Sequence, residues 1–125
     1  RYSFHWIGKS DMVYVFEAPI DLLSFISLYQ KDWRMHSYVA LCGVAEHALL
    51  QLLSDASQVK RIALCLDNDK AGLQARERIK QSLAERGYRD VFQLFSQQKD
   101  WNEDLQALTK PPPKQEEQGF AMRMG

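Results

Sequence analysis

The chain has 125 residues, and its 16 lysines and arginines balance its 16 aspartates and glutamates. This length fits one compact domain with a core of its own, and a hydrophobic share of 46% is that of a globular protein rather than a disordered or fibrous one. The net charge of zero excludes nucleic-acid binding by bulk positive charge, but it leaves open binding through a metal ion or a local basic face.

Short β-rich runs alternate with longer helical patterns along the chain. The predicted core strands are residues 12–16, 37–42, 61–66 and 91–95, and residues 2–7 are a further candidate strand. The predicted helices are residues 19–30, 45–54 and 70–86, followed by a short helical segment within residues 99–108. Near-continuous apolar strands that alternate with helices predict an α/β fold, in which a mainly parallel four-stranded sheet carries helices on both faces.

The helix predicted over residues 19–30 is apolar on nearly every side. Pro19 and Asp21 lie at its start, where both residue types are favoured. A narrow polar stripe runs along it through Asp21, Ser24 and Lys31. Because so little of its surface is polar, we expect this helix to be well buried.

The helix predicted over residues 70–86 has a different pattern. Apolar residues recur every four positions at Ala71, Ala75, Ile79 and Leu83, whereas Arg76 is expected to point away from this stripe. Residues 58–90, which include this helix, hold eight lysines and arginines against five carboxylates. This excess predicts either a local basic face that suits a phosphodiester backbone or an ordinary solvent-facing helix of mixed charge.

The chain is predicted to contain one domain and two flanking parts. Residues 1–11 are interpreted as the end of a preceding region or an extra edge strand, and residues 12–108 as the domain. Residues 109–125 include three consecutive prolines and are interpreted as a linker or disordered tail. Since the chain starts without methionine, we expect it to be part of a longer protein, whose neighbouring domains are partners.

The cysteines and the apolar runs indicate a cytoplasmic protein without a membrane span. Cys42 and Cys65 both lie inside apolar runs without metal-ligand spacing, so they are expected to be reduced, buried thiols. The apolar runs end well short of the roughly 18–20 residues that cross a bilayer. The N-terminus does not resemble a signal peptide.

Carboxylates follow two of the predicted core strands. Glu17 comes after the strand at 12–16, and Asp67 and Asp69 come after the strand at 61–66. In such sheets ligands bind outside the carboxyl ends of the strands. Three carboxylates held close repel one another unless a cation compensates, so we expect Mg²⁺ here, with Mn²⁺ as the alternative ion. The other interpretation is a simple Asp-Asn-Asp turn with a helix-capping aspartate.

Two runs, VFEAPIDLL and LCLDNDKAG, resemble the signature motifs of the Toprim domain. That family includes DnaG-type primases, type IA and type II topoisomerases, overcoming-lysogenization-defect nucleases and RecR-like proteins. Its first motif is a strand ending in Glu with an Asp four residues later, and its second is a strand ending in Asp-x-Asp, with x-Ala-Gly in the primase branch. The matching residues are Glu17, Asp21, Asp67, Asp69, Ala71 and Gly72.

The resemblance covers residues 12–105 and is greatest to primase-like Toprim domains of bacterial plasmids and conjugative elements. Those domains also carry a Lys-Asp-Trp-Asn segment similar to Lys99–Asn102, and the LCG run ending at Gly43 is similar to the end of the family's second strand. Ala18 departs from the usual glycine after the glutamate. Alanine suits this position if its backbone φ is negative.

The resemblance implies a three-layer Rossmann-like sandwich and Mg²⁺-dependent phosphoryl or nucleotidyl transfer on nucleic acid. Asp67 and Asp69 would hold the ion, and Glu17 would be a further ligand or the general acid or base. Gly43 and Gly72 would be structural residues at the site. Residues expected to support the ligands or contact phosphate are Asp21, Lys70, Lys99, Asp100 and Asn102.

Several functions remain open at this point. The first is a primase-like catalytic module of a plasmid or mobile-element replication or mobilisation protein, with DNA favoured over RNA. The second is a non-catalytic Toprim-like module that binds metal or nucleic acid. A haloacid-dehalogenase-type phosphatase is disfavoured, because its Asp-x-Asp closes the first core strand and carries Thr or Val where this chain has Ala71. Lys99 and Asp100 also fit a charged turn in which Asp100 caps the following helix.

Overall fold

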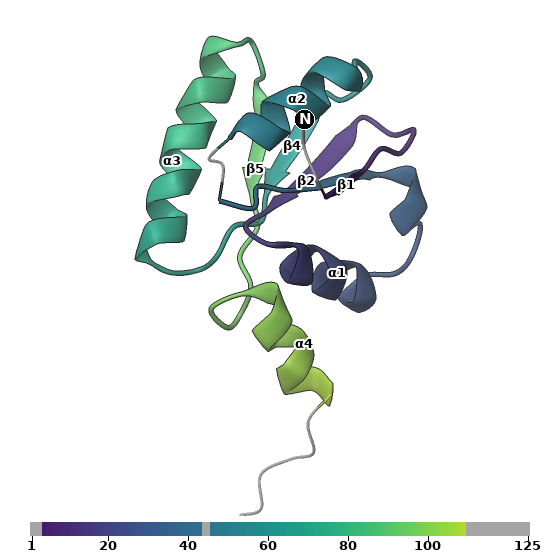
Figure 1. Ribbon diagram of the computed structural model, residues 1–125, viewed down its shortest axis with the longest axis vertical. Helices are drawn as coiled ribbons and strands as arrows, with labels where there is room; N and C mark the ends of the chain where they lie inside the picture. Colours follow the sequence, from purple (N-terminus) through teal and green to yellow (C-terminus); the bar gives the residue numbers. More distant parts are fainter. Residues whose placement is uncertain (1–3, 44–45, 110–125) are drawn as a thin grey trace, which may run out of the picture.

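A computed structural model describes residues 4–43 and 46–109, which form a sheet with helices on both faces (Figure 1). The strands of the sheet are β1 (His5–Trp6), β2 (Met12–Phe16), β3 (Ser37–Ala40), β4 (Arg61–Leu64) and β5 (Asp90–Gln93). The helices are α1 (Pro19–Leu28), the short 3₁₀ helix η1 (Trp33–Met35), α2 (His47–Asp55), α3 (Lys70–Glu85) and α4 (Trp101–Thr109).

The strands are arranged in the order β1-β3-β2-β4-β5. Strands β2 to β5 are parallel, which confirms the predicted four-stranded parallel sheet, and β1 pairs antiparallel with β3 at one edge. The central strand β2 lies next to β4, with Met12 opposite Arg61 and Val15 opposite Leu64. The segments after β2, β4 and β5 therefore leave the sheet at the same end, as the sequence predicted for its acidic residues.

One face of the sheet is aliphatic and closed. Leu49 and Leu52 of α2 pack with Ile79 and Leu83 of α3 against the valines, leucines and isoleucine of β2, β3 and β4. These four side chains are fully buried. We call this the aliphatic face.

The opposite face is aromatic and is covered by α1 and the start of α4. Phe16 and Tyr38 of the sheet pack with Phe25 of α1 and Trp101 of α4. The rings of Phe25 and Trp101 meet edge to face, with centroids 5.0 Å apart. Such tilted contacts stabilise aromatic clusters beyond the area they bury. We call this the aromatic face.

Helix α1 turns its polar stripe inward. Asp21 is only 4% exposed and Ser24 is also buried, whereas Leu23 on the outer side is 50% exposed. The expectation of a well-buried helix is therefore wrong for its outer side. The reason is that α4 packs on α1 and supplies polar partners there, since the backbone N–H of Asn102 donates to Asp21 Oδ1 at 3.2 Å and Asn102 Oδ1 lies 3.3 Å from Ser24 Oγ.

Three other expectations concern the cysteines, the C-terminal tail and the absence of a membrane span. Cys65 is buried as predicted, but Cys42 is exposed, because β3 ends two residues earlier and Cys42 lies in a turn with φ of 54°. The tail predicted over 109–125 lies outside the described residues, apart from Thr109 at the end of α4. Within residues 4–43 and 46–109, none of the helices has the length and apolar character that crossing a bilayer requires.

Candidate metal centre

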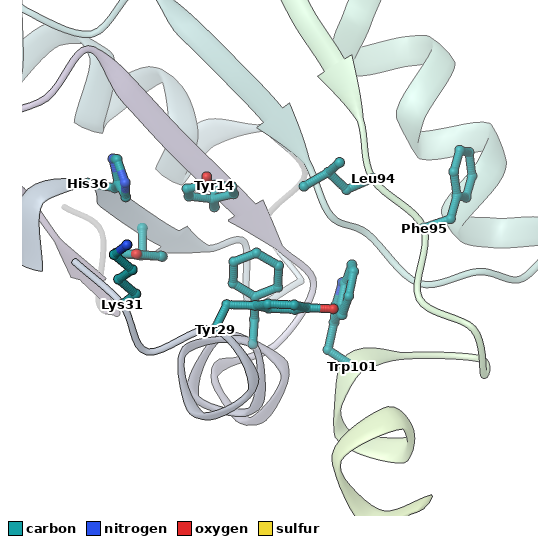
Figure 2. Close-up of a pocket in the computed structure, with 9 residues that line it drawn as sticks. Tyr14, Tyr29, Lys31, His36, Leu94, Phe95 and Trp101 are labelled. Carbon is teal, nitrogen blue, oxygen red and sulfur yellow. The ribbon is translucent and has the colours of Figure 1, made fainter. Parts of the chain in front are cut away.

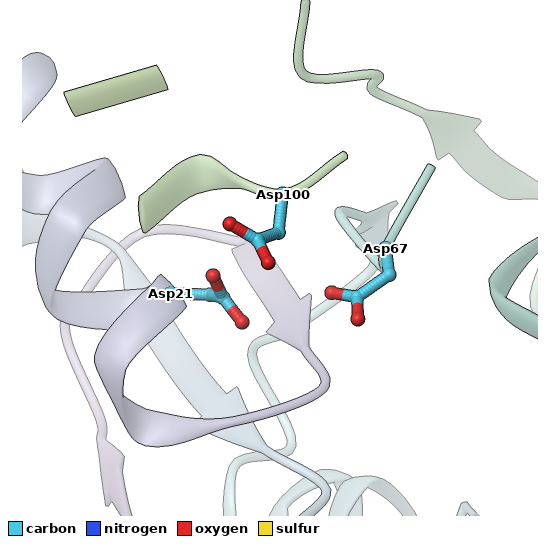
Figure 3. Close-up of side chains that lie close together, drawn as sticks. All are labelled: Asp21, Asp67 and Asp100. Carbon is cyan, nitrogen blue, oxygen red and sulfur yellow. The ribbon is translucent and has the colours of Figure 1, made fainter. Parts of the chain in front are cut away.

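Three aspartates meet at the carboxyl end of the sheet. Asp21 lies in the first turn of α1, Asp67 follows β4, and Asp100 directly precedes α4. One carboxylate oxygen from each residue lies within 4.8 Å of the other two. Figure 3 shows the three carboxylates turned toward a common space. We call these residues the acid cluster.

Asp67 has the least satisfied carboxylate of the acid cluster. Its Oδ1 is buried and has no hydrogen-bond partner within the described part of the chain, while its Oδ2 lies 3.6 Å from Lys99 Nζ. Burial raises the pKa of Asp67; the positive charge of Lys99 opposes this shift, and the negative charge of Asp100 adds to it. A buried oxygen without a partner is costly, so this position favours a cation.

Asp21 is held from the side of α4. Its Oδ1 accepts a hydrogen bond of 3.2 Å from the backbone N–H of Asn102. Burial raises the pKa of Asp21 to about 6, against the effect of this hydrogen bond, and the charges of Asp100 and Asp67 raise it further. Near neutral pH, Asp21 therefore sits closer to its protonated form than an ordinary aspartate.

Asp100 has two roles in the structure. Its Oδ1 accepts the backbone N–H of Glu103 at 2.9 Å and so caps α4, as one of the two interpretations predicted. Its Oδ2 lies 3.2 Å from Lys99 Nζ. The hydrogen bond with Asp100 and the charge of Asp67 raise the pKa of Lys99. The Lys99 ammonium thus supplies a positive counter-charge to two members of the acid cluster.

Glu17 and Asp69 flank the acid cluster. Burial raises the pKa of Glu17, and the negative charges of Asp67, Asp69 and Asp21 raise it further. Asp69 accepts the backbone N–H of Gly72 at 2.8 Å and caps α3. Glu17 is thus within electrostatic reach of the cluster, and one oxygen of Asp69 is committed to the helix. That Asp67, Asp69 and Glu17 are the metal ligands stays a prediction, beside which the structure places Asp21 and Asp100.

Gly72 fits α3 tightly against the loop that carries Asp67. A Cβ atom at this position would lie 1.9 Å from the Asp67 carbonyl oxygen. Only glycine permits this approach, so Gly72 sets the distance between α3 and the loop. Gly43 has a positive φ of 79°, and Ala18, which stands where Toprim motifs usually have glycine, has an ordinary extended φ of −136°.

Comparison with known protein families matches residues 14–105 to the family described as Toprim-like. The chain belongs to the Toprim-like family. Among its relatives, the uncharacterized protein MG010 of Mycoplasma genitalium is 30% identical over 97 residues, which are 76% of this chain and 42% of that protein. The MG010 homolog of Mycoplasma pneumoniae is 29% identical over 102 residues, which are 81% of this chain and 46% of that protein. This Toprim-like chain thus spans less than half the length of either relative.

Two solved structures share the fold. The primase fragment of the bacteriophage T7 primase-helicase protein superimposes with a TM-score of 0.61 and 25% identity, covering 78% of this Toprim-like chain and 39% of that one. The second contains T7 lagging-strand DNA polymerase and the primase domains of two gp4 subunits bound to an RNA/DNA hybrid and dTTP. It has the same TM-score and identity and covers 78% and 48% of the two chains.

Asn68 joins two loops of this Toprim-like domain and was not predicted as a site residue. Its backbone N–H donates to the Lys99 carbonyl at 2.6 Å, and its side-chain amide donates to the Ser96 carbonyl at 3.2 Å. These bonds hold the loop carrying Asp67 against the loop carrying Asp100. The sequence offers no distinguishing signal, because asparagine between two aspartates is equally typical of any turn.

Arg76 is the largest correction to the sequence analysis. It was expected to point away from the core, but it is 0% exposed and donates to the carbonyls of Leu64, Leu66 and Leu94 at 2.7–2.9 Å. Its guanidinium carbon lies 4.1 Å from the centroid of the Phe95 ring. Its hydrogen bonds to carbonyls at the ends of β4 and β5 offset the free-energy cost of burying its charge. A signal was present, because Arg76 occupies the same helical stripe as Gly72, Ile79 and Leu83.

The predicted basic face loses three of its eight cations to other contacts. Arg76 is buried, Arg61 pairs with Asp11 at 2.8 Å, and Arg78 lies 3.6 Å from Glu46. Lys70 begins α3 next to the acidic loop and is exposed. The remaining exposed cations of this segment are Lys60, Lys70, Lys80, Arg86 and Arg89.

Proposed function

We propose that this chain is the catalytic module of a Mg²⁺-dependent enzyme that transfers nucleotidyl or phosphoryl groups on nucleic acid, in the manner of a DNA primase. The observation that carries the proposal is the acid cluster, with its buried and unpartnered Asp67 oxygen, at the carboxyl edge of a Toprim-like sheet. The described functions of the two structural neighbours, a primase fragment and primase domains bound to an RNA/DNA hybrid, support the same class of substrate.

The donor set fits a hard divalent cation. Asp21, Asp67 and Asp100 offer carboxylate oxygens, which Mg²⁺ prefers, and Mn²⁺ accepts the same ligands. Asp69 and Glu17 would complete the set as the sequence motifs imply. When bound, Mg²⁺ neutralises the negative charge that develops on a phosphate during transfer.

Glu17 is proposed to move the proton of the reaction. Because burial and three nearby carboxylates raise its pKa, its carboxylate accepts a proton more readily than an ordinary glutamate does. In nucleotidyl transfer it would take the proton from the attacking hydroxyl. Lys99 would give up its bridging position between Asp67 and Asp100 and contact a substrate phosphate.

The wider setting of the chain is also part of the proposal. We infer a cytoplasmic parent protein that acts in replication or mobilisation of a plasmid or mobile element and contains further domains. DNA is favoured over RNA as its template. The relatives and structural neighbours, which are more than twice the length of the matched part, leave room for such domains.

A turnover assay on the 125-residue chain tests the proposal. Single-stranded DNA, labelled nucleoside triphosphates and Mg²⁺ are expected to give a metal-dependent product. Glu17→Gln should lower its rate by about 100-fold or more without lowering the melting temperature. Lys80→Ala, on the outer surface of α3, is the control and should retain the wild-type rate.

The outcomes separate the competing functions. Full Mg²⁺-dependent activity in the Glu17→Gln variant would contradict the role of Glu17. Mg²⁺ binding without any turnover in the wild-type chain would instead favour the non-catalytic binding module. Absence of Mg²⁺ binding by calorimetry would overturn the catalytic proposal, and absence of nucleic-acid binding as well would overturn both interpretations.

A further inference from the structure

A cavity of about 440 Å³ opens on the aromatic face, between α1 and the end of β5 (Figure 2). This volume lies within the range of about 300–1,000 Å³ that is typical of small-molecule sites. Lys31 and His36 lie at one end of it, and Phe95 lies at the other. Its aromatic lining consists of Tyr14, Phe25, Tyr29, Tyr38, Phe95 and Trp101.

The cavity exists because the helices of the aromatic face cover only part of the sheet. Helix α1 packs against β2 and β3, and α4 lies beyond the carboxyl edge, so no helix of the described chain covers β5 on this face. Phe92 and Phe95, in and after β5, are therefore exposed, and Tyr29 at the end of α1 is 56% exposed. Exposed aromatic side chains around a concave surface indicate a binding site.

The cavity lining includes a largely buried side chain that carries a hydroxyl group. Tyr38 lines the cavity and is only 2% exposed. Burial raises the pKa of Tyr38, so this hydroxyl stays a neutral donor. Tyr14 stacks on the Tyr38 ring, with centroids 5.4 Å apart and 17° between the planes.

The charges around the cavity define the ligand further. Two basic side chains, Lys31 and His36, line it, and no carboxylate does, although carboxylates gather at the neighbouring edge of the sheet. A ligand with a flat aromatic ring, hydrogen-bonding atoms on that ring and a negative charge would match the aromatic lining, the Tyr38 hydroxyl and the two basic side chains. A nucleotide has this combination.

The cavity adjoins the acid cluster through two elements. Trp101 lines the cavity and directly follows Asp100, and its Nε1 donates to the Cys65 carbonyl at 2.9 Å. Phe25 lies one helical turn after Asp21 on α1. A nucleic-acid strand bound at the acid cluster can therefore reach the cavity with one of its next nucleotides.

We propose that this cavity binds an unpaired base of a single-stranded nucleic acid, with a backbone phosphate of the same strand on Lys31. The base lies against the rings of Tyr29 and Tyr14 and hydrogen-bonds the Tyr38 hydroxyl. The inference rests on the proposed function in one respect, namely that the substrate is nucleic acid. It does not require the chain to be catalytic or to hold a metal ion.

A binding assay tests the proposal. The fluorescence anisotropy of a labelled oligodeoxythymidine of about 10 nucleotides is measured in EDTA as the 125-residue chain is added. Tyr29→Ala and Lys31→Ala change exposed side chains and should fold normally, and each is expected to weaken binding about five- to tenfold. Leu23→Ala on the outer side of α1 and Lys80→Ala on α3 are the matched apolar and cationic controls and should bind like the wild type. Tyr38→Phe, which removes only the hydroxyl, should weaken binding about threefold.

Two further arms separate this proposal from its alternatives. Asp67→Asn should bind the oligonucleotide in EDTA as tightly as the wild type, so failure of the metal site leaves the cavity test intact. Equal affinity of the wild type, Tyr29→Ala and Lys31→Ala would overturn the proposal. So would tight binding of free dTMP without binding of the strand, or a wild-type dimer in analytical ultracentrifugation that Tyr29→Ala converts to monomer.

Discussion

The two faces of the sheet are built from different side chains and are closed to different degrees. On the aliphatic face, α2 and α3 bury branched side chains such as Leu49 and Ile79 completely. On the aromatic face, α1 covers β2 and β3 but leaves a cavity beside β5, with Tyr29 and Phe95 exposed. The aliphatic face is sealed, whereas the aromatic face, which adjoins the acid cluster, keeps an open surface. Both proposed binding sites thus lie away from the face that holds the larger aliphatic core.

The largest expected effect is on the stability contributed by the aliphatic face. Leu49→Ala should lower the free energy of unfolding by about 3 kcal/mol, because it removes a fully buried side chain and leaves a void. Tyr29→Ala on the aromatic face should lower it by less than about 1 kcal/mol. Urea denaturation followed by circular dichroism measures both values. Equal losses would show that the two faces do not differ as described.

Arg76 joins α3, which covers the aliphatic face, to the ends of β4 and β5. Its replacement should lower the free energy of unfolding nearly as much as Leu49→Ala does. Arg76→Met should destabilise the fold by about 3 kcal/mol, because the three carbonyls it serves lose a charged donor. Arg78→Met is the control, since its contact with Glu46 is exposed and should contribute less than about 0.5 kcal/mol. A small effect for Arg76→Met would mean that water replaces the guanidinium.

Binding of a metal ion at the acid cluster should stabilise the folded chain. Saturating Mg²⁺ is expected to raise the free energy of unfolding by about 1–3 kcal/mol, since it binds the folded chain only. Asp67→Asn should abolish this gain while costing little stability in EDTA, because the substitution removes a buried charge. Thermal denaturation with and without Mg²⁺ checks both statements. An undiminished Mg²⁺ effect in Asp67→Asn would exclude Asp67 as a ligand.

The last comparison concerns the pH dependence of stability in EDTA. The pKa of Asp21 rises from its ordinary value of 3.8 to about 6 on folding, so between these values the folded chain binds a proton that the unfolded chain does not. Stability should therefore be greatest near pH 4, fall as the pH rises through about 6 and level off above that value. The raised pKa values of Glu17 and Asp67 act in the same direction. Asp21→Asn should flatten the profile measured by urea denaturation, and an unchanged profile would contradict the assignment to Asp21.

Most of the fold could be predicted from the sequence, because its strands and helices have strong patterns. The runs at 12–16 and 61–66 are apolar and lead directly into acidic residues, so both the parallel sheet and the position of the acidic edge followed from them. The inward polar stripe of α1 could not be predicted in the same way. Its direction depends on α4, which packs on α1 from the far end of the chain.

The site was predictable in its motifs but not in its full geometry. Glu17, Asp67 and Asp69 follow strands and are visible in the sequence, whereas the proximity of Asp21 to Asp100 depends on the contact between two helices. The aromatic cavity is even less visible, since its lining comes from five separate segments whose aromatic residues look like ordinary core. Arg76 was mispredicted for a different reason. Its position in the helical stripe indicated burial, but its charge indicated exposure, and the side chain is in fact fully buried.

The bond between the Asn102 amide and the Asp21 carboxylate joins residues 81 positions apart. Closing so long a loop costs chain entropy, which the energy of the contact offsets only once it has formed. We therefore expect this contact to form late in folding. The acid cluster is accordingly expected to assemble only after β2, β4 and β5 have paired and α4 has docked, so that a partly folded chain offers no complete ion site. A divalent cation should consequently slow unfolding of this domain far more than it speeds folding.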